Sequence, residues 1–420
     1  MSDCAVILAA GKGTRMNSIL PKVMHRISGT SLLEHVIAQV KRCGIHTIYV
    51  VVGYGKEQIS SVIKQKGVYF VEQKEQKGTG HALRCAKKAL AGKTGDMIVL
   101  PGDAFFLGEN TLSRFIKSHR KSRADMTVLS TLVDEPCGYG RVIREKKAVA
   151  GIREELDCVA DEKQINEINS GVYAFKRKSV GAALKKVPVN KKKNEYYLTD
   201  IVSVLCAQQK KVGAFCVTEN ESVLGINDRI QLSEIQAMDT QKIIKAHQKK
   251  GVTVIDPMNT YIEDNVRIGK DTIIYPFTYI EKDVTIGADA RLGPFCKIRS
   301  SSVIGDKSAI GSFVEVVRSR VGKKTNIKHL SYIGDAHVGS DVNIGAGTIT
   351  ANYDGKNKHR TTVKDGAFIG SNSVLIAPVS VGKKAKTGAG SVLTPGNDIP
   401  EGQVAFGVPA RIQEHKRKRG

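Results

Sequence analysis

The sequence predicts an α/β protein of two domains, in which a domain with a mostly parallel β-sheet is followed by a β-helix of hexapeptide repeats. In the first half, strand-like and helix-like segments alternate. In the second half, an aliphatic residue recurs at every sixth position. The length of 420 residues also exceeds what one hydrophobic core ordinarily supports. We expect the first domain at 1–228, a connecting helix at 229–250 and the β-helix at 251–420.

The composition excludes several classes of protein. No apolar run is long enough to span a bilayer, and the apolar stretch 5–10 lacks the basic residues that begin a signal peptide. Eight cysteines without a C-x-x-C pair favour reduced thiols in the cytoplasm over disulfides or a zinc site. The net charge of +24 is spread over both halves, which favours small anionic ligands over nucleic acid. We therefore expect a cytoplasmic protein that binds neither membranes nor nucleic acid.

The first half reads as alternating strands and helices. Buried strands are expected at 5–9, 47–52 and 97–100, and helices at 31–42, 57–64 and 79–90. This alternation predicts a mostly parallel sheet with helices on both faces. Residues 229–250 contain neither Gly nor Pro and are expected to form one helix between the domains.

The second half follows a period of six. Isoleucine, leucine or valine occupies ten successive positions at this spacing: 262, 268, 274, 280, 286, 292, 298, 304, 310 and 316. Neither a helix nor an ordinary strand has this period, whereas hexapeptide coils stack such side chains inward. The period does not define the handedness of the coil. An interruption near 345–362 predicts a loop, where functional residues concentrate.

A glycine pair follows the first predicted strand, within the segment 8–16 (LAAGKGTRM). Glycines at this point let backbone N–H groups approach a phosphate chain, and Arg15 and Lys22 supply positive charge for it. The lysine of a P-loop is out of register here, and the acidic residue of a dinucleotide fingerprint is missing. A turn without a ligand is the structural alternative.

This segment resembles the signature of sugar-nucleotide pyrophosphorylases, and further segments of that family follow in order at 73–82, 102–103, 138–141, 154, 169–171, 195–200 and 225–227. With the repeats, the sequence is similar over nearly its whole length to bifunctional bacterial enzymes that are both N-acetylglucosamine-1-phosphate uridylyltransferases and glucosamine-1-phosphate N-acetyltransferases. The resemblance implies a Rossmann-like nucleotidyltransferase (pyrophosphorylase) domain, a left-handed parallel β-helix that carries the acetyltransferase, and a homotrimer. Its product, UDP-N-acetylglucosamine, would feed bacterial cell-wall and lipopolysaccharide synthesis.

The resemblance assigns UTP and N-acetylglucosamine 1-phosphate to residues of the first domain: Leu8, Ala9, Ala10, Gly11, Lys22, Gln73, Gly78, Thr79, Gly102, Asp103, Gly140, Glu154, Asn169 and Asn227. Arg15 and Lys22 would bind the triphosphate as catalytic cations, and Asp103 and Asn227 would hold Mg²⁺. Phosphoryl transfer between two anions depends on cations and alignment. One Asp and one Asn supply the oxygen ligands that Mg²⁺ prefers.

In the β-helix, the resemblance makes His329 the general base, since an imidazole can take a proton near neutral pH. Glucosamine 1-phosphate is assigned to Arg299, Glu315, Tyr332, Asn343 and Lys358, and the resemblance also places Asn352 at a sugar hydroxyl or the amine. Acetyl-CoA is assigned to Ala346, Asn352, Tyr353, Ser371 and Ala389. The backbone N–H of Ala346 would stabilise the developing oxyanion.

The sequence departs from the family pattern at three places. Val317 stands where the family has Lys, with Arg318 next to it, and a shift of one residue in a strand reverses the face. Leu156 replaces a second Lys. A C-terminal Arg expected against CoA is missing near 406–409, where Arg411 is out of register. The basic run 415–419 is expected to be either a solvated end or an attractor of CoA phosphates.

Three alternatives remain at this point. The chain could be a pyrophosphorylase whose β-helix is not catalytic, which Val317 favours and the set of His329, Tyr332 and Asn352 argues against. It could be a regulatory subunit of a nucleotide-exchange complex, which Arg15, Lys22, Asp103 and Asn227 argue against. Nucleic-acid binding through the net charge is the weakest of the three.

Overall fold

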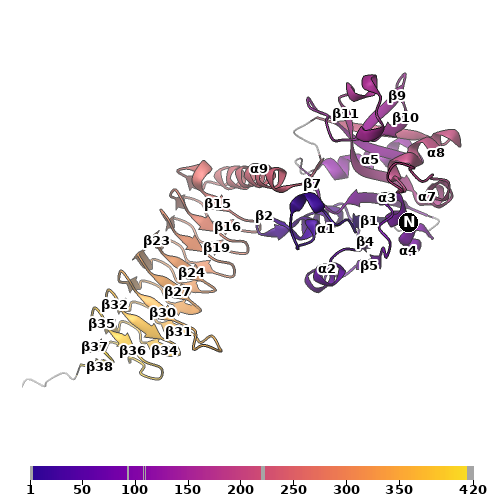
Figure 1. Ribbon diagram of the computed structural model, residues 1–420. Helices are drawn as coiled ribbons and strands as arrows, with labels where there is room; N and C mark the ends of the chain where they lie inside the picture. The colour runs from indigo at the N-terminus through magenta and orange to yellow at the C-terminus, as the bar shows by residue number, and fades with distance from the viewer. Residues whose placement is uncertain (1–2, 92–93, 107, 109, 219–222, 414–420) are drawn as a thin grey trace, which may run out of the picture. The chain divides into compact units, whose positions relative to one another are not determined.

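The computed structural model describes residues 3–413 except 92–93, 107, 109 and 219–222. The chain folds into two compact units, 1–234 and 235–420, shown in Figure 1. Helix α9 (Arg229–Gln248) covers nearly the segment for which one uninterrupted helix is expected.

The first unit is built on a nine-stranded sheet in which β10-β9-β11-β6-β1-β4-β5 are neighbours and β8 joins β11 to β12. The strands are β1 (Cys4–Ala9), β4 (Ile48–Val52), β5 (Val68–Glu72), β6 (Asp96–Pro101), β8 (Met126–Leu132), β9 (Arg141–Glu145), β10 (Ala148–Arg153), β11 (Glu167–Lys176) and β12 (Val212–Val217). Two small sheets pair β2 (Arg26–Ile27) with β3 (Thr30–Ser31), and β7 (Ala104–Phe106) with β13 (Val223–Gly225).

Parallel pairing joins β5, β4, β1 and β6, as expected, and also joins β8 to β12. The strands β8 to β11 otherwise pair antiparallel. Part of the reason is local, because only the two residues 146–147 connect β9 to β10 and so short a connection permits only a hairpin. The expectation of a mostly parallel sheet therefore holds for the half that carries the glycine-rich segment and not for the other half.

The helices of the first unit pack on this sheet: α1 (Leu32–Arg42), α2 (Lys56–Val62), α3 (Thr79–Cys85), α4 (Lys87–Leu90), α5 (Thr111–Ser122), α6 (Ala160–Lys163), α7 (Arg177–Lys185) and α8 (Ile201–Ala207). Ser31 caps α1 through a reciprocal capping box with Glu34. The helix expected at 79–90 is broken at Ala86, whose ψ of 51° is not helical. Two separate apolar clusters form the core of this unit.

The second unit is a left-handed parallel β-helix of three flat faces. Face I consists of β14 (Thr253–Val254), β17 (Ile273–Ile274), β20 (Arg291–Leu292), β23 (Ala309–Ser312), β26 (Asn326–His329), β29 (Asn343–Ile344), β32 (Phe368–Ile369), β35 (Lys386–Thr387), β37 (Val404–Gly407) and β38 (Ala410–Ile412). Face II consists of β15 (Tyr261–Ile262), β18 (Tyr279–Ile280), β21 (Lys297–Ile298), β24 (Glu315–Val317), β27 (Tyr332–Gly334), β30 (Ile349–Ala351), β33 (Val374–Ile376) and β36 (Val392–Leu393). Face III consists of β16 (Arg267–Ile268), β19 (Thr285–Ile286), β22 (Val303–Ile304), β25 (Arg320–Val321), β28 (Ala336–Val338), β31 (Thr361–Val363) and β34 (Val379–Val381).

The six-residue period becomes a stack of aliphatic side chains inside the prism. On face II, Ile262 pairs with Ile280, Ile280 with Ile298 and Ile298 with Val316, and all four are buried. The next coil is one residue shorter, since Val316 pairs with Ile333. Such a row of packed, branched side chains accounts for a core without tryptophan.

This stack gives a stability prediction. Ile298 is fully buried between two neighbouring coils, so Ile298→Ala leaves a cavity and is expected to lower the free energy of unfolding by about 3 kcal/mol. The matched change Ile298→Val removes one methylene and is expected to cost about 1 kcal/mol. Urea unfolding followed by circular dichroism measures both. Equal costs for the two variants would contradict the stacked core.

Candidate functional site

A cavity of about 550 Å³ opens in the first unit beside the carboxyl ends of β1 and β6. Most of the predicted nucleotide and sugar residues line it: Leu8, Ala9, Ala10, Gly11, Arg15, Lys22, Gln73, Gly78, Thr79, Asp103, Glu154, Asn169 and Asn227. The other two, Gly102 and Gly140, adjoin it through their backbones. The Gly102 N–H donates to the Leu8 carbonyl at 2.8 Å, and the Gly140 carbonyl accepts from the Asn169 N–H at 2.8 Å.

The residues predicted to bind the triphosphate and Mg²⁺ converge at one end of this cavity. Lys22 Nζ forms an ion pair with Asp103 Oδ2 and lies 3.4 Å from Asn227 Oδ1. Arg15 Nη2 donates to the same Asn227 oxygen at 2.9 Å. These four side chains come from three separate stretches of the chain, and the fold brings them into direct contact.

The donor set at this point suits Mg²⁺. Asp103 and Asn227 supply two oxygen atoms linked through the Lys22 ammonium, and Mg²⁺ takes a few protein oxygens, with phosphate and water completing its octahedron. Within the described residues, no group of three or more His, Cys, Asp or Glu side chains is placed to hold a metal.

Amide side chains and close backbone packing shape the end of the cavity that the resemblance assigns to the base. The buried Gln73 amide donates to the Gly78 carbonyl at 3.2 Å, and Gln76 donates to the Ala10 carbonyl at 3.0 Å. Gly78 has a φ of 87°, and a Cβ there would lie 2.7 Å from the Tyr196 carbonyl oxygen. Glycine is thus required at 78 on two grounds.

A further part of the cavity lining presents polar groups suited to a sugar. Glu154 accepts from Thr199 Oγ1 at 2.9 Å, and the Asn169 amide donates to the Tyr173 hydroxyl at 2.8 Å. Burial raises the pKa of Glu154 and of Tyr173. Thr199 and Tyr173 are cavity residues to which sequence reasoning assigned no role. Thr199 falls in a segment of the family pattern, whereas only the structure places Tyr173 there.

In the second unit, several predicted acetyltransferase residues follow the edge between faces I and II. His329 ends β26 at this edge and is exposed. Its carbonyl accepts from the Gly347 N–H at 3.4 Å, which ties it to the turn that carries Ala346. The turns of the next coils carry Ser371 and Ala389, and their backbones connect through hydrogen bonds of 2.7 Å.

Face II carries Glu315 and Tyr332, two of the residues predicted to bind the sugar phosphate. Glu315 pairs in register with Tyr332, and Arg299 Nη1 lies 3.4 Å from the Glu315 carboxylate. Asn343 lies on the neighbouring face I, in β29. A Cβ on Gly334 would lie 2.6 Å from the Tyr332 ring, so glycine there lets the ring lie across the face.

The remaining predicted residues lie at the other edge of face II, on the loop between β30 and β31. Asn352 is buried, whereas Tyr353 and Lys358 are exposed and form an isolated antiparallel bridge. Asp354 organises this loop by accepting from two backbone N–H groups and from His359 at 2.7 to 2.8 Å. Within one chain, the predicted acetyltransferase residues are thus divided between two edges of the prism and are not gathered in one cluster.

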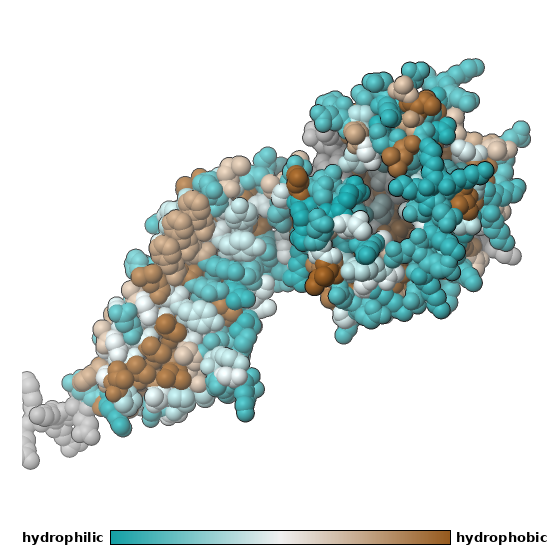
Figure 2. All heavy atoms as spheres, viewed as in Figure 1, coloured by the Kyte–Doolittle hydropathy of each residue, from teal (hydrophilic) through white to brown (hydrophobic). Residues whose placement is uncertain are grey.

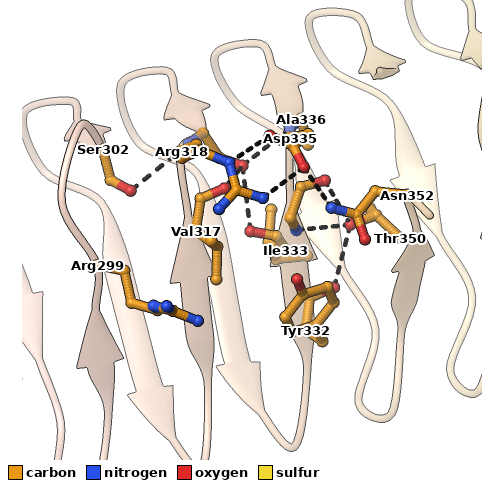
Figure 3. Close-up of polar contacts among 12 residues, drawn as sticks. Arg299, Ser302, Val317, Arg318, Tyr332, Ile333, Asp335, Ala336, Thr350 and Asn352 are labelled. Carbon is orange, nitrogen blue, oxygen red and sulfur yellow. Dashed lines mark hydrogen bonds and ion pairs between the residues drawn. The ribbon is translucent and has the colours of Figure 1, made fainter. Parts of the chain in front are cut away.

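The structure also locates the three departures from the family pattern. Val317 is buried, and the adjacent Arg318 pairs with Asp335 at the edge between faces II and III (Figure 3). Leu156 is exposed, and its carbonyl lies 3.3 Å from the Lys192 ammonium, a cation supplied from elsewhere in the chain. Arg411 pairs with Phe406 in the terminal hairpin. The basic run 415–419 lies outside the described residues.

Comparison with known proteins is consistent with both units. Residues 5–166 match the MobA-like NTP transferase domain family, and residues 360–395 match the hexapeptide repeat of succinyl-transferase. Three curated relatives each bear the name bifunctional protein GlmU. The protein of Syntrophomonas wolfei is 40% identical over all of both chains. That of Clostridium beijerinckii is 39% identical over 96% of each chain. That of Syntrophotalea carbinolica is 40% identical over 96% of this chain and 94% of its own. Full-length similarity at this level shows that the chain belongs to the bifunctional GlmU family.

Proposed function

We propose that this enzyme makes UDP-N-acetylglucosamine in two steps, one in each unit. The β-helix transfers the acetyl group of acetyl-CoA to glucosamine 1-phosphate, and the first unit then couples the product to UTP and releases pyrophosphate. The convergence of Arg15, Lys22, Asp103 and Asn227 in one cavity is the observation that carries the second step. Membership of the family over the full length of the chain supports the presence of both steps in one protein.

In the first unit, an oxygen of the sugar phosphate attacks the α-phosphorus of UTP. The new P–O bond forms as the α–β bond breaks and pyrophosphate leaves. Arg15 and Lys22 balance the negative charge that the two anions bring together. Asp103 and Asn227 would hold Mg²⁺, which supplies further charge neutralisation when bound. Glu154 and Asn169, which also line the cavity, orient the sugar.

In the β-helix, His329 takes a proton from the amino group of glucosamine 1-phosphate while the nitrogen attacks the thioester carbonyl. The C–N bond forms, the C–S bond breaks, and CoA leaves as the thiol after its sulfur takes that proton back from His329. The Ala346 N–H donates to the oxyanion. Arg299, Tyr332 and Lys358 hold the phosphate, and the turns at Ser371 and Ala389 line the CoA groove.

The divided acetyltransferase residues support a homotrimer, in which one copy's loop 352–360 completes a site on the next copy. The edge between faces I and II also exposes a ladder of stacked rings. Phe277, Phe295 and Phe313 have centroids 4.8 and 5.4 Å apart and are 47 to 61% exposed. Figure 2 shows apolar side chains on the surface of this unit. Exposed apolar surface of this kind favours association.

The substrates and the thiols point to the cytoplasm. UTP and acetyl-CoA are cytoplasmic metabolites, and all eight cysteines are free, which suits a reducing compartment. Among the described helices, none has the length and apolar character that a membrane span requires.

A pyrophosphorylase with a non-catalytic β-helix is the second candidate, and one observation favours it. Val317 removes a cation from the phosphate pocket, although Arg299 remains beside Glu315. Incubation of the purified chain with acetyl-CoA and glucosamine 1-phosphate separates the candidates, because only the bifunctional enzyme releases CoA. Absence of CoA from the unmodified protein would leave the second candidate standing.

Glu154 gives a pH-dependent prediction. Burial raises the pKa of this carboxyl, so it becomes an ionised acceptor for sugar hydroxyls only at a higher pH than an ordinary glutamate. The KM for N-acetylglucosamine 1-phosphate is therefore expected to fall as the pH rises from about 5 to about 8. In the Glu154→Gln enzyme, the part of this pH dependence that comes from ionisation of Glu154 should be absent. The substrate phosphate titrates in the same way with the unmodified enzyme and with Glu154→Gln, so it does not cause a difference between them. Identical pH profiles of KM for the two enzymes would contradict the role of Glu154.

A further inference from the structure

The edge between faces II and III carries a stack of residues with left-handed backbone conformation. Five successive coils place Asn265, Asp283, Ser301, Arg318 and Asp335 there, with φ between 46° and 66°. Side chains that leave the chain at the same corner of successive coils can contact one another. The bond of 2.6 Å from Asn265 Nδ2 to Asp283 Oδ1 is one such contact.

In the last two coils of this stack the contact is an ion pair. Arg318 Nε donates to Asp335 Oδ1 and Arg318 Nη2 donates to Asp335 Oδ2, both at 2.7 Å. Two parallel bonds from a planar guanidinium fix the orientation of the carboxylate. Arg318 also holds the pKa of Asp335 below its usual range, so the carboxylate stays ionised and can only accept hydrogen bonds.

Asp335 in turn fixes the side-chain amide of Asn352. Asp335 Oδ2 accepts a hydrogen bond from Asn352 Nδ2, as Figure 3 shows. Because an ionised carboxylate cannot donate, the amide nitrogen must face Asp335 and the amide oxygen must point elsewhere. The Asn352 carbonyl accepts from the His359 N–H at 2.8 Å, so its backbone is held as well.

The amide oxygen of Asn352 is left for a ligand. Asn352 is only 8% exposed, and in the part of the chain that the structure describes no protein group donates to its side-chain oxygen. The exposed Tyr353 and Lys358 flank it on the same loop, and Lys358 lies close enough to favour the ionised form of Asp335. A fixed acceptor in this setting selects a donor group on a substrate.

We propose that Asp335, held by Arg318, is a positioning residue for acetyl transfer that turns the Asn352 amide oxygen toward an N–H group of a substrate. This inference rests on the proposed function of the β-helix. Two substrates of that reaction carry N–H groups, namely the amine of the hexosamine phosphate and the amides of the pantetheine arm of acetyl-CoA. The bonds that form and break in the reaction stay the same.

The test is Asp335→Asn in the full-length chain, where two amides face each other and neither orientation is fixed. The kcat/KM for acetyl transfer is expected to fall about 10-fold to 100-fold, with pyrophosphate release unchanged. A higher KM for acetyl-CoA would identify the pantetheine amide as the donor. A higher KM for glucosamine 1-phosphate, or a lower kcat alone, would identify the amine.

Asp306→Asn is the matched control. Asp306 pairs with Lys323 at 2.9 Å, across the same 17-residue separation between successive coils, but at the edge between faces III and I. We expect this variant to keep full acetyl transfer. Arg318→Gln retains the Asp335–Asn352 bond but no longer fixes the carboxylate, so it should lower acetyl transfer less than Asp335→Asn does. It replaces Asp335→Asn as the test if circular dichroism shows the Asp335→Asn protein to be unfolded.

A double-mutant cycle with Asn352→Ala separates positioning from a general structural role. If Asp335 acts through Asn352, adding its substitution to Asn352→Ala causes no further loss. Losses that multiply, or an Asp335→Asn enzyme as active as the Asp306→Asn control, would overturn the inference. An unmodified chain that releases no CoA would instead overturn the proposed function on which it rests.

Discussion

Replacing His329 with alanine is expected to abolish the release of CoA while leaving pyrophosphate release unchanged. His329 lies exposed at the edge between faces I and II, next to the turn that carries Ala346, and no other histidine is predicted to take the proton of the attacking amine. Loss of a general base typically lowers the rate by a factor of about 10² to 10⁴. A thiol-reactive dye measures the CoA released.

His337→Ala provides the matched control. His337 is also exposed on the β-helix, but it lies on face III, away from the predicted acetyl-CoA turns. We expect this variant to release CoA at the unmodified rate. Equal activity of the His329→Ala and His337→Ala enzymes would contradict the assignment of the base.

The second large effect is expected for Asp103→Ala, which should abolish pyrophosphate release and leave CoA release intact. Asp103 forms an ion pair with Lys22 beside Asn227, so its removal takes away a metal ligand and leaves the ammonium without its carboxylate. We expect a loss of about 10³-fold or more, because positioned charge carries most of the catalysis in phosphoryl transfer. A coupled assay for pyrophosphate at saturating Mg²⁺ measures it.

An exposed carboxylate of the same unit controls for charge alone. Asp134 follows β8 and is exposed, so Asp134→Ala changes the net charge equally and should leave the rate unchanged. Raising the Mg²⁺ concentration should restore at most part of the activity of Asp103→Ala, because Asn227 still supplies one ligand but the carboxylate ligand is lost. Full activity of Asp103→Ala at low Mg²⁺ would contradict a role in metal binding.

Much of this account could be predicted from the sequence because its signals are local or periodic. The isoleucine ladder predicts one inward-facing residue on each face of each coil, and the structure pairs Ile280 with Ile298 on one face. The glycine-rich segment after the first strand predicted a phosphate site, and Arg15 and Lys22 line the cavity there. Both features depend only on neighbours in the chain.

The remainder depends on contacts between distant segments. The antiparallel half of the sheet is one such feature, because β11 pairs with β6 and β8 across long stretches of the chain. Tyr173 carries no motif, and its place in the cavity follows from the pairing of β11 with β6 and β8, which lie far from it in the sequence. The Arg318–Asp335–Asn352 contacts arise from the corner geometry of three coils, which the hexapeptide period does not specify.

Two separable activities in one chain are the central claim, and a complementation assay tests it most directly. His329→Ala and Asp103→Ala enzymes are each supplied with acetyl-CoA, glucosamine 1-phosphate, UTP and Mg²⁺, alone and mixed, and UDP-N-acetylglucosamine is quantified by chromatography. The account predicts no product from either enzyme alone and product from the mixture, because the acetylated intermediate passes from one protein to the other. A mixture that yields none, while the unmodified chain does, would contradict it.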